Sequence, residues 1–448
     1  MSEKYMPMGA SDRFFFYALT GRSTIDEIEE LTFKKPFDLD VMKDSAADAL
    51  KCVPEFNKRI VLRNGRPEAV TGSGDIAFIP EEENKFVHLG SGETNGLLFY
   101  FRYTDKRLVF SAFHGLTDGT GMSKFVRTVI HFYMKRKGFE FTPAEEAEMT
   151  KGLRITEGIP PDADPDDVFT PYEKWGDPDA GPEWHYENPG AFAIPEDAYP
   201  EECDHIHLCR VEASLPQLKA ARDKAGVSYL PYLTDAVSTA VSKTYSGGDK
   251  PIVSMSGIDQ RPNLGSGTMV NCSDSIFFPF TSELRKKDMK ERCAGLKEIM
   301  KRQFENALHK KMAAEKVMTV RELEKDPAGA AAVAKRMELL PSGDNFTPMT
   351  YVLTFIGDLS MGKAADRLLD DIRIYNTARA CFVIISFYGD KLHITVGNRS
   401  DSNDFANGII KELRERGINA ALANDSRFYG DKFGYETIKT ANESEEQL

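Results

Sequence analysis

The chain has 448 residues, of which 41% are hydrophobic and 10% aromatic, so it can fill more than one core and is not a wholly disordered protein. Its formal net charge of −13 at pH 7 argues against binding to nucleic acid. Six irregularly spaced cysteines make no disulfide framework, and no segment has the pattern of a secretory leader or the apolar length of a membrane helix. We therefore expect a cytoplasmic protein with no membrane span.

The first part of the chain alternates helical and extended patterns. A helix is predicted over about 40–52 and a strand over 59–63, followed by a hairpin of two aromatic-rich strands at 96–103 and 107–113. After Gly121 the apolar side chains recur at helical spacing, and basic residues followed by glycine predict the end of this helix. The apolar positions of this helix are Met122, Phe125, Val126, Val129, Ile130 and Tyr133.

A proline-rich segment divides the chain. Nine prolines lie between about 158 and 202, and so many cannot occupy helix interiors or central strands. We therefore predict a first half over 1–160, a proline-rich crossover over 161–204, a second half over 205–440, and an acidic tail over 441–448.

The second half begins with an alternating strand and continues with two helices before further strands. The predicted strands lie at 206–211, 251–257, 275–280 and 350–356, and the predicted helices lie at 214–226, 230–245 and, as one long charged helix, 283–311. A hairpin at 381–388 and 391–396 then leads through a polar loop to a helix over about 404–416. This order repeats the hairpin, polar loop and helix of the first half.

The repeated order predicts two related α/β halves, each a mixed or antiparallel sheet with helices packed on it. The similarity is one of pattern, with little identity between the two segments. On the pattern alone, two unrelated hairpin–helix units remain an alternative.

One motif carries chemistry: His114 to Gly119 reads HGLTDG and fits HxxxDG. His114 stands at the end of a predicted strand, where a loop turns through Gly119 and Gly121 into a helix. A neutral imidazole held in such a turn can take a proton from a hydroxyl or amine that attacks a carbonyl. Asp118 is too close along the loop to orient the ring, and we expect it to fix the loop by pairing with a distant arginine. The residues alone leave a second interpretation open, a structural histidine followed by an aspartate that caps a helix.

The motif and its surroundings resemble the superfamily that includes chloramphenicol acetyltransferase, alcohol acetyltransferases, plant-type acyl-CoA acyltransferases and the condensation domains of nonribosomal peptide synthetases. The resemblance is strongest to the bacterial alcohol-acetyltransferase-like group. Weaker similarity extends over most of the chain and includes Ile258 to Pro262, Val270-Asn271 and Thr354 to Gly357. The resemblance implies two halves in a V with a tunnel between them and a histidine near the middle of the tunnel.

The resemblance assigns roles to individual residues. His114 matches the catalytic base, Asp118 the structural aspartate and Gly119 the motif glycine. Arg261 is the candidate partner of Asp118. Thr354 is a candidate donor to the tetrahedral oxyanion. A hydroxyl bonded within its own strand is the alternative that the sequence favours. A further candidate site residue is Asn271, where the family usually has a glycine–asparagine pair.

The implied function is transfer of an acyl group from a thioester to a hydroxyl or amine acceptor, with acyl-CoA as the expected co-substrate and no tightly bound cofactor. The first alternative is a condensation-type enzyme that takes its acyl group from the phosphopantetheine of an acyl or peptidyl carrier protein. The second is a non-catalytic relative that binds an acyl group or a partner. Phe113 replaces the second histidine of condensation domains, and the DFGWG element of the plant enzymes is absent, which favours the bacterial acetyltransferase-like group.

Cys203, His205, His207 and Cys209 suggest a zinc site because they alternate along one face of a predicted strand. Successive positions on one face are about 6.6 Å apart, so one tetrahedral ion cannot contact all four. We therefore expect ordinary sheet residues at these positions and no metal site in the chain.

Overall fold

The computed structural model describes residues 5–6, 8–18, 26–63, 66–81, 87–160, 171, 173–177, 190–195, 205–245, 248–305, 308–325, 349–377, 381–398 and 401–429. The predicted acidic tail lies outside this set, and of the proline-rich crossover only residue 171 and the ranges 173–177 and 190–195 are described. Among the described helices, none combines the length and the apolar character needed to cross a membrane.

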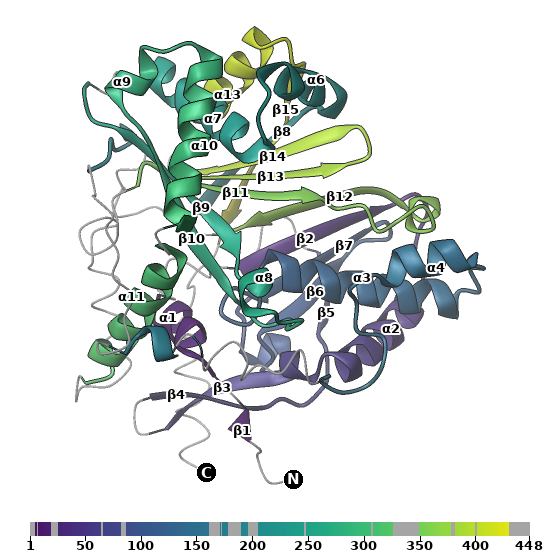
Figure 1. The fold of residues 1–448 in the computed structure, drawn as a ribbon. Helices are drawn as coiled ribbons and strands as arrows, with labels where there is room; N and C mark the ends of the chain where they lie inside the picture. Colours follow the sequence, from purple (N-terminus) through teal and green to yellow (C-terminus); the bar gives the residue numbers. More distant parts are fainter. Residues whose placement is uncertain are drawn as a thin grey trace.

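The first half is built on a five-stranded sheet whose core side carries helices (Figure 1). In spatial order the strands are β12 (Leu369–Asn376), β2 (Asp26–Phe33), β7 (Arg107–Phe113), β6 (Phe99–Tyr103) and β5 (Phe78–Pro80). Helices of this half are α1 (Ala10–Ala18), α2 (Leu39–Cys52), α3 (Gly119–Arg136) and α4 (Pro143–Thr150), and a small sheet contains β1 (Tyr5–Met6), β4 (Arg66–Thr71) and β3 (Lys58–Arg63).

The apolar stripe of α3 determines how it packs. The ring centroid of Phe125 lies within 5.5 Å of those of Phe99 and Phe110 on the sheet and 4.9 Å from that of Phe56, in tilted and edge-on arrangements. The helix begins after Asp118, whose side chain accepts a hydrogen bond from the amide of Gly121. Burial of these large rings fixes the helix over the strands that lead to its N-terminus.

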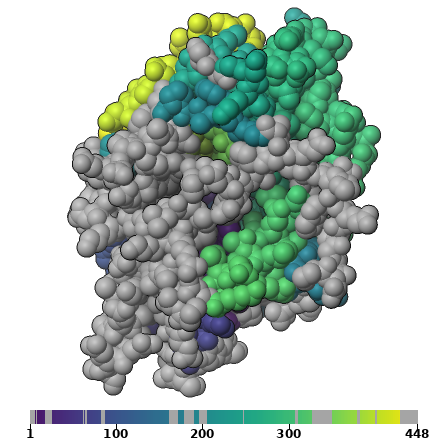
Figure 2. Space-filling model, turned by 90° about the vertical axis from the view of Figure 1, so that its left-hand side faces the viewer, coloured from purple at the N-terminus to yellow at the C-terminus, as the bar shows by residue number. Residues whose placement is uncertain are grey.

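The second half is built on a seven-stranded mixed sheet. In spatial order its strands are β10 (Ser273–Phe280), β9 (Ile252–Asp259), β11 (Tyr351–Asp358), β13 (Phe382–Tyr388), β14 (Lys391–Asn398), β8 (His205–Ser214) and β15 (Ala420–Tyr429). Its helices are α6 (Leu215–Ala225), α7 (Tyr229–Thr244), α8 (Arg261–Leu264), α9 (Ser282–Arg285), α10 (Met289–Glu305), α11 (Leu308–Leu323) and α13 (Asp404–Glu415). In the space-filling view the green surface of α11 lies below the teal and yellow surface of this half (Figure 2).

Two features differ from the sequence-based predictions. The single charged helix predicted over 283–311 is wrong, because the segment forms α9, α10 and the start of α11; α9 ends at Arg285, and the chain begins a new helix at Met289. In addition, β12 comes from the predicted second half but pairs antiparallel with β2 in the sheet of the first half. The proline-rich segment therefore does not separate the two sheets completely.

The order of hairpin and following helix that was predicted to repeat is present in both halves of the structure. Hairpin β6–β7 leads to α3, and hairpin β13–β14 leads to α13. The antiparallel neighbour of the second hairpin strand is β2 in the first half and β8 in the second.

A buried ion pair joins the two sheets beside β12. Arg210 on β8 donates two hydrogen bonds, of 3.2 and 3.0 Å, to the carboxylate of Glu30 on β2. The guanidinium also lies over the ring of Tyr375 on β12. Burial alone would raise the pKa of Glu30, but Arg210 and Arg107 lower it below its ordinary value. Glu30 therefore stays ionised inside the protein.

Glu29, the neighbour of Glu30, points to the other face of β2 and lies under α3. Ser123 donates a 3.0 Å hydrogen bond to its carboxylate, and the side chain is almost fully buried. Burial raises the pKa of Glu29 to about 8, in spite of the hydrogen bond from Ser123. The carboxyl group is therefore held in its neutral form at neutral pH.

Glu29→Gln is predicted to remove part of the loss of stability at alkaline pH. The folded-state pKa of about 8 lies above the ordinary value of 4.5, so the contribution of Glu29 is fully present below pH 4.5 and is lost as the pH rises through 8. Thermal unfolding followed from pH 4 to pH 9 should give a higher Tm for the variant than for the wild type at pH 9 and no such gain at pH 4. Equal Tm differences at both pH values would contradict the burial of a neutral carboxyl group.

Candidate active site

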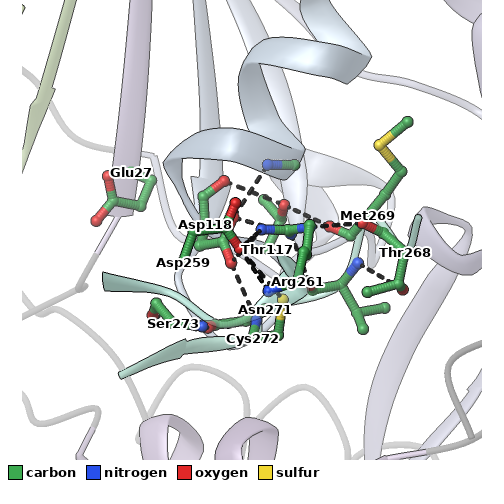
Figure 3. A network of polar contacts seen from close by, with 12 residues as sticks. Glu27, Thr117, Asp118, Asp259, Arg261, Thr268, Met269, Asn271, Cys272 and Ser273 are labelled. Carbon is green, nitrogen blue, oxygen red and sulfur yellow. Dashed lines mark hydrogen bonds and ion pairs between the residues drawn. The ribbon is translucent and has the colours of Figure 1, made fainter. Parts of the chain in front are cut away.

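The candidate site lies where the loop after β7 meets the long β9–β10 loop of the second half. His114 follows the last residue of β7, and Asp118 immediately precedes α3. The β9–β10 loop, residues 260–272, contains α8 and brings Arg261 and Asn271 to the same place (Figure 3). Each half therefore supplies part of the site.

Asp118 and Arg261 form the centre of a buried polar network (Figure 3). Two guanidinium nitrogens of Arg261 lie 3.0 Å from the two carboxylate oxygens of Asp118. The carboxylate also accepts hydrogen bonds of 3.0 Å from the amides of Gly121 and Cys272. All acceptor positions of Asp118 are thus used in holding the loops, and none is directed to the imidazole.

Arg261 also forms hydrogen bonds with backbone carbonyls of its own loop. Its guanidinium donates to Thr268 at 2.7 Å and to Val270 at 2.9 Å, and it also contacts the carboxylate of Asp259. Burial alone would raise the pKa of Asp118, but the charge and hydrogen bonds of Arg261 lower it below its ordinary value. The pair is therefore ionised and shapes the β9–β10 loop around the start of α3.

His114 is fixed by contacts on one side of its ring. Its Nδ1 atom lies 3.2 Å from the carbonyl oxygen of Thr117 and 3.6 Å from the carboxylate of Glu27. Both neighbours are acceptors, so the proton of the neutral ring belongs on Nδ1 and the lone pair on Nε2. The ring packs against Phe15 at 4.4 Å, and its side chain remains 20% exposed.

Thr117 and Asn271 hold the loop that carries His114. The Thr117 hydroxyl donates a 2.8 Å hydrogen bond to the carbonyl of Met269, and the amide of Asn271 donates to the carbonyl oxygen of His114. Asn271 thus contacts the backbone of the histidine and lies 3.5 Å from Nδ1.

Two glycines at the start of α3, Gly119 and Gly121, lie in close contact with the second half. A Cβ atom at Gly121 would lie 2.2 Å from the Met269 carbonyl oxygen, and one at Gly119 would lie 2.9 Å from the side chain of Ile356. The backbone at Gly121 has no room for a larger residue. Gly119 brings the start of α3 next to β11.

Thr354 lies on β11, two residues before Ile356. Within the described part of the chain its hydroxyl makes no hydrogen bond, and it is partly exposed. The ladder between β9 and β11 ends at Ser256 and Leu353, although both strands continue beyond these residues. Thr354 is the first residue of β11 beyond this ladder, and a Cβ atom at Gly257 on β9 would lie 4.0 Å from its hydroxyl.

Glu27 is a site residue that sequence analysis missed. It lies on β2, pairs with Ala112 on β7, and is 6% exposed. Burial raises the pKa of Glu27 above its ordinary value, while the neighbouring His114 and a hydrogen bond from Asn376 oppose that shift. The only available signal was the run of acidic residues in a strand-like segment, DEIEELTF, which says nothing about which carboxylate reaches the histidine.

Neither models of known protein families nor curated protein sequences match this chain. Solved structures match this chain at low sequence identity. The chain is similar to the TRI3 trichothecene 15-O-acetyltransferase of Fusarium sporotrichioides, with 10% identity and a TM-score of 0.58 over 92% of this chain and 95% of that one. It is similar to F. graminearum TRI101 complexed with coenzyme A and deoxynivalenol, with 10% identity and a TM-score of 0.56 over 93% and 99%.

A third similar structure is the first condensation domain of the CDA synthetase, with 11% identity and a TM-score of 0.55 over 93% of this chain and 95% of that domain. The chain therefore has the two-lobed α/β fold shared by chloramphenicol acetyltransferase-like acyltransferases and condensation domains. The fold predicted from the sequence is confirmed.

Asp118→Asn is predicted to lower the free energy of unfolding by about 3–5 kcal/mol, because it leaves the buried Arg261 without its charged partner. The folded-state pKa of Asp118 is lowered, so its contribution is present above the ordinary pKa of 3.8 and is lost as the pH falls through the folded value. Denaturant unfolding at pH 7 measures the loss. Asp259→Asn is the matched control, since it removes a more exposed contact of the same arginine and should cost less than about 1 kcal/mol. Equal effects of the two variants would contradict the central role of Asp118.

Proposed function

We propose that this protein is an acyltransferase that moves an acyl group from a thioester, with acyl-CoA as the donor, to a hydroxyl or amine acceptor. The observation that carries the proposal is the histidine at the junction of the two lobes, with Nδ1 directed at the Thr117 carbonyl and Nε2 left as a base. The similarity in fold to an O-acetyltransferase and to a structure that contains coenzyme A supports it.

The proposed reaction needs no nucleophile from the protein. Nε2 of His114 takes the proton of the acceptor hydroxyl or amine as its oxygen or nitrogen forms a bond to the thioester carbonyl carbon. The tetrahedral oxyanion then collapses, the carbon–sulfur bond breaks, and the imidazolium returns the proton to the leaving thiolate. Asp118 and Gly119 keep the loop in position and take no part in proton transfer.

We place the passage for the thioester and acceptor where the ladder between β9 and β11 ends. This position is supported by the end of that ladder at Leu353 and by the side chain of Ile356, which would lie 2.9 Å from a Cβ atom at Gly119. Thr354 follows Leu353, and its hydroxyl is our candidate donor to the oxyanion.

Glu27 has a proposed part in the same step. A carboxylate 3.6 Å from Nδ1 stabilises the positive charge that His114 carries after it accepts a proton. Glu27 would thus act as a positioning and electrostatic residue that supports the base from the side opposite to Nε2.

Two alternatives remain from the sequence. A condensation-type enzyme would accept its acyl group from a carrier protein, and similarity to a condensation domain favours testing that donor. A non-catalytic relative would need no accessible base, whereas the partial exposure of His114 supports a catalytic role.

The decisive experiment measures release of free CoA from a panel of acyl-CoAs with hydroxyl and amine acceptors. His114→Ala is predicted to lower kcat/KM by roughly 10²–10⁴-fold, the usual contribution of a general base, with little change in Tm. His131→Gln is the matched control because this histidine of the same half lies on α3 and pairs with Glu146. Transfer from a loaded carrier protein but not from acyl-CoA would favour the first alternative, and no transfer from either donor would favour the second.

Glu27→Gln is predicted to lower kcat/KM roughly tenfold, equivalent to about 1.4 kcal/mol of transition-state stabilisation, without removing activity. Glu29→Gln is the matched control, because Glu29 lies on the same face of β2 but bonds Ser123. Initial rates measured across the pH range should show the defect for Glu27→Gln alone. An equal defect in both variants would indicate damage to the strand, and no defect would contradict the proposed role of Glu27.

A further inference from the structure

Gly257 on β9 is a strand glycine that no contact between described residues requires. A Cβ atom there would have the Thr354 hydroxyl, at 4.0 Å, as its only neighbour within 4 Å among these residues, and Gly257 itself is exposed. β9 pairs with β10 in unbroken register across this position, opposite Ser275, so the glycine marks no bulge. Glycine weakens a strand interior and is often found there where a ligand approaches the backbone closely. Gly257 therefore leaves an open position on the face of the sheet.

Two hydroxyl groups lie on either side of Gly257. Ser275 is its register partner on β10, and Thr354 is its neighbour on β11. Both residues are partly exposed, and neither hydroxyl makes a hydrogen bond with another residue that the structure describes. Ser275, Gly257 and Thr354, which we call the hydroxyl row, thus present two donors beside an open position.

The next row on this face of the sheet is apolar. Residues two apart on a strand share a face and are about 6.6 Å from each other. Met255 precedes the hydroxyl row by this step, and its register partners are Phe277 on β10 and Val352 on β11. Helix α11 lies against β10, and its Met312 packs on the cluster that contains Phe277 and Met255 (Figure 1). Met255, Val352 and Met312 are only partly buried, so this apolar surface is accessible.

The opposite side of the hydroxyl row meets the loop that carries the base. Ser273, one step away on β10, donates from its amide and its hydroxyl to the side-chain oxygen of Asn271, each at 2.9 Å. The amide of Asn271 donates in turn to the carbonyl oxygen of His114. On β11 the corresponding step leads to Ile356, which would lie 2.9 Å from a Cβ atom at Gly119. The hydroxyl row therefore lies between the loop of His114 and the apolar row.

We propose, on the basis of the function proposed above, that the acyl chain of the thioester crosses Gly257 and that its tail lies against the apolar row and Met312. The thioester carbonyl would then be at the Thr354 hydroxyl, the candidate oxyanion donor. An acetyl group is too short to cover the step of about 6.6 Å to the apolar row. The donor is thus an acyl thioester with an unbranched alkyl chain longer than acetyl, and Gly257 is the residue that admits this chain.

The test compares transfer from acetyl-CoA and octanoyl-CoA by the purified full chain. The wild type should have the higher kcat/KM with octanoyl-CoA. Gly257→Val should lower that value roughly 10–200-fold, the usual effect of misplaced bulk in an apolar site, and should change the acetyl value little. Its Tm should not fall, because the added side chain has room and valine suits a strand. Ala421→Val is the matched control, since it adds the same bulk to β15, the opposite edge of the sheet.

Met255→Ala tests the apolar row independently of the glycine. It should lower kcat/KM for octanoyl-CoA and leave the value for acetyl-CoA nearly unchanged, because only the longer chain reaches this residue. Met318→Ala is the matched control, since this methionine of α11 is 50% exposed and belongs to none of the clusters described above. A loss in Met318→Ala equal to that in Met255→Ala would contradict the apolar row as the place of the alkyl tail.

Calorimetric titration separates this inference from the proposed reaction. The wild type should bind octanoyl-CoA more tightly than acetyl-CoA by roughly tenfold or more, through burial of the added methylene groups, and Gly257→Val should remove the difference. A Gly257-dependent difference in binding without transfer from any donor would support the chain site and contradict the proposed reaction. Equal binding and transfer of the two donors by the wild type, or an equal loss with both in Gly257→Val, would overturn the inference and leave the proposed reaction intact.

Discussion

The ion pair between Asp118 and Arg261 is the interaction on which the site depends. It joins the start of α3 in the first half to the β9–β10 loop of the second, and both partners are buried. Because Asp118 also accepts the amides of Gly121 and Cys272, one carboxylate fixes both loops at once. The position of His114 follows, since Thr117 and Asn271, the residues that hold it, belong to these same two loops.

Three buried glutamates lie within four residues of β2, and each has a different environment. Glu27 approaches the imidazole, Glu29 is neutral under α3, and Glu30 is ionised beside Arg210. The alternation of a strand explains the separation of Glu29 from Glu30, and the local partners explain their opposite pKa shifts. One strand therefore contributes to the proposed catalysis and also to the contact between the two sheets.

Much of the fold could be predicted from local patterns. The stripe from Met122 to Tyr133, the two hairpins and the repeated order of elements all have short-range periodicities. The pairing of β12 with β2 could not be predicted, because it joins residues more than 300 positions apart and leaves no periodic signal. His114, Asp118 and Arg261 were accessible through a motif and a family resemblance, whereas the approach of Glu27 to the imidazole depends on the register between β2 and β7.

The pairing of β12 with β2 affects how the chain folds during synthesis and whether it can be cut into two separate halves. Until residue 376 has been synthesised, β2 has an unpaired edge on one side, so the earlier sheet cannot reach its final form during translation. A protein cut at the proline-rich segment would leave this edge on the first fragment and an unattached strand on the second. The two lobes, although built on a repeated plan, thus mature as one cooperative unit.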